Sequence, residues 1–173
     1  MNRSTPLLLS SLFALGLAMP AHAAGPNDAQ IAAIVVAANA VDIDAGKQAE
    51  TKTHNNDVRA FAERMVADHS GVNQQATALV QKLHVTPEDN DTSKSLTRGG
   101  TATRAKLAGL SGKAFDKAYV DNEVKYHETV LGALDKTLIP NASNAELKAL
   151  LVKVRPAFVA HLEHAKHLQA ELK

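Results

Sequence analysis

The sequence reads Phe61-Ala62-Glu63-Arg64-Met65-Val66-Ala67-Asp68-His69 in the middle of a pattern that predicts one long helix, from about Asp57 to Leu83. Steps of four and three place one set of side chains on a single face of that helix. Its members are apolar or small except for one histidine: Val58, Ala62, Met65, His69, Val72, Ala76, Leu79 and Leu83. An ionisable ring on an apolar face needs a polar partner or stays uncharged. His69 therefore requires partners from other parts of the chain.

Three further stretches predict long helices, and each has an ionisable side chain on its apolar face. The first follows Pro26, with Asn27 or Asp28 as its cap. Its inner face is Ile31, Val35, Ala38, Asp42, Ala45 and Ala49. The third predicted helix runs from about Lys113 to Leu138 and stops before Pro140. Its inner face is Val120, Glu123, His127, Val130, Leu134 and Leu138.

The fourth predicted helix begins at Ser143-Asn144-Ala145-Glu146, which has the pattern of a capping box. Its inner face is Leu147, Leu151, Val154, Phe158, His161, Ala165, Leu168 and Leu172. Pro156 lies within this pattern and is expected to kink or split the helix, because proline cannot donate a backbone hydrogen bond.

The connections between these helices predict the topology. A short turn over residues 54–57 makes the first two helices antiparallel. From His84 to Gly112 the connection is too long for a tight hairpin, and only Thr101–Leu110 within it is expected to be helical. We therefore predict an all-α fold, a ferritin-like four-helix bundle with one long crossover between helices two and three.

The ionisable side chains on the four inner faces all lie near the middle of their helices, so they should converge at one level: Asp42, His69, Glu123, His127 and His161. One interpretation is a metal site, since imidazole and carboxylate ligands suit iron, zinc, manganese or copper. The other is a hydrogen-bonded polar core, which avoids the cost of unpaired buried groups. A surface site that includes His164 and His167 is a third interpretation.

The same residues argue against some activities. A di-iron oxidase normally carries two Glu-x-x-His motifs, and this chain has none. No serine-based triad or phosphate-binding glycine loop can be assembled. The pattern therefore predicts metal binding, with a role in stress protection, or a non-catalytic interaction or structural module, and assigns no catalytic residue.

The N-terminus has the pattern of a secretory signal. Arg3 precedes an apolar run from Leu7 to Met19, and Ala21-His22-Ala23 is a small-x-small cleavage site. We expect cleavage after Ala23, a single domain over residues 24–173, no membrane-spanning segment in the mature chain, and a periplasmic or secreted protein. The chain has 19 Lys and Arg against 18 Asp and Glu, and this balance argues against nucleic-acid binding. It has no cysteine, which excludes disulfides and thiol catalysis.

Several of these stretches resemble a bacterial family of exported ferritin-like proteins of unknown function, often labelled predicted outer membrane protein. The resemblance rests on Val41-Asp42-Ile43-Asp44-Ala45-Gly46, on Phe61 to His69, on Leu110 to Asp116 with the later His127, and on Pro156 before His161. It implies export and a four-helix ferritin-like fold, but no activity. We expect the family to favour Glu at the position of Asp42. Neither a spanning helix nor a barrel pattern supports the outer-membrane label.

Overall fold

In a computed structural model, residues 25–173 are described, and they form helices, turns and loops without any strand. Five helices are long: α1 (Asp28–Lys52), α2 (Asn56–Lys82), α3 (Asp91–Ala108), α4 (Gly112–Ala133) and α6 (Ala145–Glu171). A π-helical turn, η1 (Leu134–Leu138), and the short α5 (Ile139–Asn141) lie between α4 and α6. The all-α prediction is confirmed for these residues. The predicted signal peptide, residues 1–23, lies outside them.

Asparagine side chains begin most of the long helices. Asn27 caps α1 and forms a capping box with Gln30, as one of the two predicted caps. Asn55 caps α2, within the predicted turn over residues 54–57. Asn144 caps α6 by accepting hydrogen bonds from two backbone N–H groups, so the predicted capping box that starts at Ser143 was wrong. An Asn side chain satisfies the free N–H groups of a first turn as well as Ser does.

The connection between α2 and α4 differs most from the prediction. It was expected to be helical only over Thr101–Leu110, whereas α3 extends over Asp91–Ala108. Its buried positions are only Ser93, Gly100 and Leu107, and with one large apolar side chain among them they do not form an apolar stripe. Residues 25–173 therefore contain five long helices where four were predicted.

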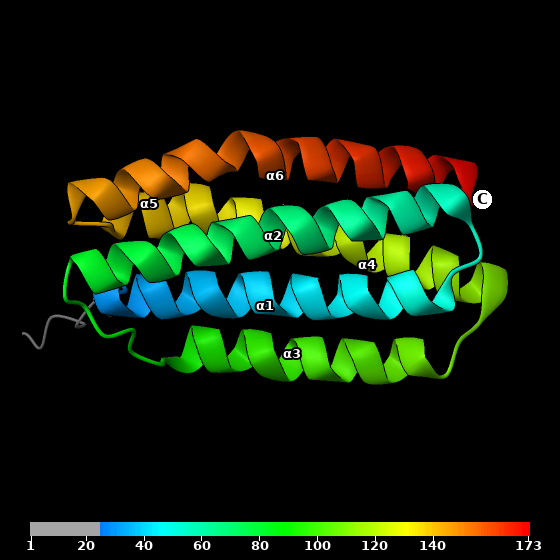
Figure 1. The fold of residues 1–173 in the computed structure, drawn as a ribbon, viewed down its shortest axis with the longest axis horizontal. Coiled ribbons are helices and arrows are strands. Elements are labelled where there is room, and N and C mark those ends of the chain that lie inside the picture. Colours follow the sequence, from blue (N-terminus) through cyan, green and yellow to red (C-terminus); the bar gives the residue numbers. More distant parts are fainter. Residues whose placement is uncertain (1–24) are drawn as a thin grey trace, which may run out of the picture.

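The helices lie side by side along one axis (Figure 1). α1 packs against α2 and α3, and α6 packs against α4 and α2. α3 carries the chain back along the length of the molecule, so α4 runs in the same direction as α2 (Figure 1). The core lies among α1, α2, α4 and α6, and α3 covers the outer side of α1.

Two prolines lie within helical segments and do not end them. Helical geometry continues from α4 through η1 and past Leu138 into α5, which contains Pro140 near its start. Pro156 lies within α6, which is assigned as one continuous helix from Ala145 to Glu171. Of the two expected effects of Pro156, a kink or a split, the split was therefore wrong.

The composition of α1 bears on the expectation that the mature chain has no membrane-spanning segment. By length and composition alone, α1 is apolar enough to cross a membrane, with a mean hydropathy of 1.4 over its most apolar window. The sequence was expected to have no such segment after the signal. Half of that window is buried inside the structure, and a core helix has the same composition as a membrane span. The buried Asp42 lies in the middle of α1.

Candidate metal centre

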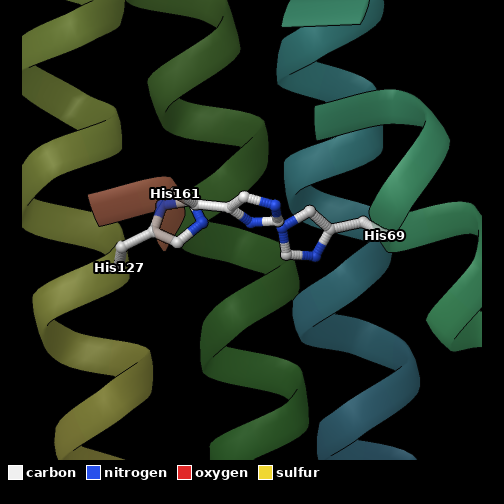
Figure 2. Close-up of side chains that lie close together, drawn as sticks. All are labelled: His69, His127 and His161. Carbon is white, nitrogen blue, oxygen red and sulfur yellow. The ribbon is translucent and has the colours of Figure 1, made fainter. Parts of the chain in front are cut away.

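The structure brings the five predicted polar residues together in the core. Asp42 comes from α1, His69 from α2, Glu123 and His127 from α4, and His161 from α6, and each is at most 2% exposed. Figure 2 shows the imidazoles of His69, His127 and His161 turned toward one another. Their ring centroids lie 5.3–5.6 Å apart. Parallel and antiparallel helices thus contribute to one compact polar cluster near the middle of the bundle.

A buried amide of α1 fixes the imidazole of His69. Nδ1 of His69 lies 2.7 Å from Oδ1 of Asn39, while Nδ2 of Asn39 donates to the carbonyl oxygen of Val35 at 2.8 Å. Since the amide oxygen only accepts, Nδ1 of His69 is the protonated nitrogen. The other ring nitrogen, Nε2, faces the cluster and lies 2.8 Å from Oδ2 of Asp42.

A backbone carbonyl fixes the second imidazole. Nδ1 of His127 lies 3.0 Å from the carbonyl oxygen of Glu123, one turn earlier in α4. That oxygen cannot donate, so Nδ1 carries the proton and Nε2 carries the lone pair. Nε2 of His127 lies 3.5 Å from the same Asp42 oxygen that faces His69.

A carboxylate at the edge of the core fixes the third imidazole. Nε2 of His161 lies 2.8 Å from Oδ2 of Asp68, whose side chain is 42% exposed. Asp68 also pairs with Arg64, one turn earlier in α2, at 3.4 Å. Burial opposes ionisation of Asp68, but the hydrogen bond and charge of His161 outweigh it and lower the pKa of that carboxyl. His161 therefore donates through Nε2 and keeps its lone pair on Nδ1.

Apart from the 2.8 Å contact between Nε2 of His69 and Oδ2 of Asp42, the inner atoms of the cluster have no hydrogen-bond partner. They are Nε2 of His69, Nε2 of His127, Nδ1 of His161, both carboxylate oxygens of Asp42 and Oε2 of Glu123. One ligand atom each from His69, His127 and His161 lie within 4.8 Å of one another, and so do ligand atoms from Asp42, Glu123 and His127. Tetrahedral ligands with bonds of about 2.1 Å to one ion are about 3.4 Å apart. The atoms of each set would therefore have to move inward to hold one ion.

The two carboxyl groups respond differently to their surroundings. Burial and the neighbouring Asp42 raise the pKa of Glu123 well above its usual range. Burial also opposes ionisation of Asp42, but the charge of and hydrogen bond to His69 prevail and lower its pKa. Without a bound cation, Asp42 holds the negative charge and Glu123 holds a proton. A bound cation would favour loss of that proton, so the pair can supply up to two negative charges.

Burial keeps two of the imidazoles neutral. It lowers the pKa of His127, although the nearby Asp42 acts in the opposite direction. It also lowers the pKa of His161 to about 4, against the hydrogen bond to Asp68. Metals bind the neutral form of imidazole. The two rings are therefore available as ligands without first losing a proton at neutral pH.

The remaining candidates lie elsewhere. His164 packs edge-on against Phe61, with ring centroids 5.1 Å apart, and His167 pairs with Glu171 at 3.2 Å. Sequence reasoning missed Asn39, because the expected inner face of α1 contained its neighbour Ala38. It also left Asp68 out of the predicted site, although Oδ2 of Asp68 lies 2.8 Å from Nε2 of His161.

Comparison with known proteins gives a family and no function. No curated protein and no solved structure matches the chain. A protein-family model described as "Domain of unknown function (DUF4142)" matches residues 16–168, which include all five residues of the cluster. The chain belongs to the DUF4142 family.

Proposed function

We propose that the chain binds a divalent transition-metal ion in its core through His69, His127 and His161, with Asp42 and Glu123 as carboxylate ligands. The protonation of the three imidazoles carries this proposal. Each ring donates its outer N–H to a fixed acceptor, the inner nitrogens of His127 and His161 have no partner, and that of His69 faces the carboxylate of Asp42. Histidines that bind metal are held in this way by acceptors behind the ring, which orient the ring and raise its basicity.

A metal-free, hydrogen-bonded core is the alternative, and one contact favours it. Nε2 of His69 lies 2.8 Å from Oδ2 of Asp42, a separation that suits an imidazolium–carboxylate pair. That pair still leaves the inner nitrogens of His127 and His161 without partners. An unpaired buried polar group costs about 1–3 kcal/mol. A cation satisfies all of these acceptors at once, so the metal interpretation accounts for more of the site.

The donor set limits the choice of metal. Three imidazole nitrogens with one or two carboxylate oxygens suit iron, zinc, manganese and copper(II), whereas copper(I) prefers thiolate or thioether sulfur. Two ionised carboxyl groups would balance the charge of a dication. Because all five side chains are at most 2% exposed, the site is better suited to holding an ion than to admitting a bulky substrate.

The wider setting is also part of the proposal. α1, α2, α4 and α6 would form a ferritin-like four-helix core to which α3 is added, and α4 running in the same direction as α2 supports that topology (Figure 1). The signal pattern that ends at Ala23 supports export to the periplasm or the medium, and a role there in stress protection would follow from metal binding. The near balance of acidic and basic residues supports partners other than nucleic acid.

Metal titration tests the proposal. The metal-free protein would be titrated calorimetrically with zinc, iron(II), manganese and copper(II), alongside His69→Ala, His161→Ala and the exposed control His167→Ala. We expect binding by the wild type and by His167→Ala, loss of binding in the two core variants, and a metal-dependent rise in melting temperature only where binding occurs. Absence of binding by the wild type would support the metal-free core. Loss of binding in His167→Ala alone would move the site to the surface of α6.

A further inference from the structure

A groove opens on the side of the molecule where α3 meets α1 and α4. It has a volume of about 350 Å³, within the range of pockets for small organic ligands. α3 contacts α4 far less than it contacts α1, so the two helices stand apart as walls. Val41 and Ala45 of α1 form the floor, and Leu96 of α3 and Tyr126 of α4 line the sides. The groove is thus apolar at its base and open to solvent.

Two adjacent glycines of α3 line this groove, and only one has a packing reason to be glycine. A Cβ atom at Gly100 would lie 2.7 Å from methyl carbons of Val41, so only glycine allows the close approach of α3 to α1. A Cβ atom at Gly99 would meet nothing within 4 Å. Glycine inside a helix costs about 1 kcal/mol relative to alanine. Gly99 therefore lowers the stability of α3, and no packing contact requires it. The missing side chain leaves space in the groove.

The polar groups of the lining indicate the chemistry of an occupant. Lys125 is the charged side chain among the lining residues, and no carboxylate accompanies it. The remaining polar lining is mainly hydroxyl groups, from Thr92, Ser95, Thr103 and Thr129, with the amide of Asn122. An apolar floor with one cation and several hydroxyl groups complements a molecule that has an apolar body and a single anionic group.

The groove also adjoins the polar cluster. Asn122, one of its lining residues, donates from Nδ2 to Oε1 of Glu123 at 3.3 Å. The ring of Tyr126 lies edge-on to His127, with centroids 6.2 Å apart, and its hydroxyl donates to the carbonyl oxygen of Ala38 at 2.8 Å. A molecule in the groove would therefore lie one side chain away from the carboxylate side of the cluster.

We propose that this groove binds a small anionic amphiphile, a carboxylate with a short hydrocarbon body. The hydrocarbon covers Val41, Ala45 and Leu96, and the carboxylate is placed near Lys125. The proposal stands on the lining of the groove and on Gly99, and it does not require a metal in the core.

Octanoate is the probe, with 1-octanol as its uncharged counterpart, and binding is followed by calorimetry on residues 24–173. Gly99→Leu places a side chain in the groove, and Gly71→Leu on α2 is the matched control because its Cβ also meets nothing within 4 Å. We expect octanoate binding by the wild type and the control, and at least a tenfold loss in Gly99→Leu. Ser95→Phe, one turn earlier on α3, gives the same loss if Gly99→Leu fails to fold.

Lys125→Gln tests the anionic part. It should weaken octanoate binding by about two- to fivefold, the range for an exposed charge pair, and leave 1-octanol binding unchanged. The proposal is overturned if the wild type does not bind octanoate, if blocking the groove leaves binding intact, or if Lys125→Gln has the same effect on both probes.

Discussion

Replacing Asn39 by Leu tests whether His69 is a metal ligand or only a structural residue. Asn39 and His69 are each 2% exposed, and Oδ1 of Asn39 is the acceptor for Nδ1–H of His69 at 2.7 Å. Leucine has a similar size but accepts no hydrogen bond, and water cannot replace the lost acceptor at a buried position. If the ring kept its proton on Nδ1, the unpaired N–H would cost about 1–3 kcal/mol of stability.

The ring has a way to reduce this loss. It can move the proton to Nε2, which then donates to Oδ2 of Asp42, 2.8 Å away. The metal-free protein should therefore lose only about 1 kcal/mol, at the lower end of that range. The proton on Nε2 then occupies the lone pair through which His69 would bind a metal. We expect metal affinity to fall about 10- to 100-fold, the usual effect of removing a hydrogen-bond partner behind a ligand, or about 1.4–2.7 kcal/mol.

Calorimetric titration with zinc and urea unfolding of the metal-free protein measure the two effects separately. Asn39→Asp keeps an acceptor for Nδ1–H and should retain most of the affinity. Asn73→Leu on α2 is the matched control, because the side chain of Asn73 contacts the carbonyl of Val36 at 3.5 Å and no residue of the cluster. The reasoning is refuted if Asn39→Leu binds zinc as tightly as the wild type, or if Asn73→Leu loses as much affinity.

Two further predictions concern stability. Because the pKa of His161 is about 4 in the folded protein and about 6.5 in an unfolded chain, the unfolded state takes up a proton first as pH falls. The stability that the neutral ring contributes is complete above pH 6.5 and is lost between pH 6.5 and 4, by about 3 kcal/mol. Urea unfolding of the metal-free protein should show a shallower acid dependence in His161→Gln, and equal slopes would contradict the assignment. Gly46→Ala should destabilise the fold, because its Cβ would lie 2.8 Å from a side-chain carbon of α2, whereas Gly71→Ala, with nothing within 4 Å, should stabilise α2 by up to about 1 kcal/mol. Thermal unfolding checks the pair, and a lower melting temperature for Gly71→Ala than for Gly46→Ala would be the wrong order.

The sequence was sufficient to find the four helices that enclose the core. Their apolar residues recur at the helical period, and the polar residues on those faces are the ones that the structure brings together. α3 lacked that signal, since its contact with α1 uses small side chains instead of an apolar stripe. Ser93, Gly100 and Leu107 are its buried positions, and they recur every seven residues, or two helical turns. Together with the Asn90 cap, this spacing was the available signal for a helix that packs closely on one neighbour.

The hydrogen-bond partners of the three histidines were harder to predict than the histidines themselves. The helical period of apolar residues identifies which residues of one helix are buried. A hydrogen bond between helices depends in addition on how the two helices are rotated against each other. Asp68 shows the difference, because its side chain is 42% exposed and carries no burial signal. Only the packing of α2 against α6 brings it within 2.8 Å of His161. Since that contact fixes which nitrogen of His161 is free, the chemistry of the core depends on a residue that sequence periodicity assigns to the surface.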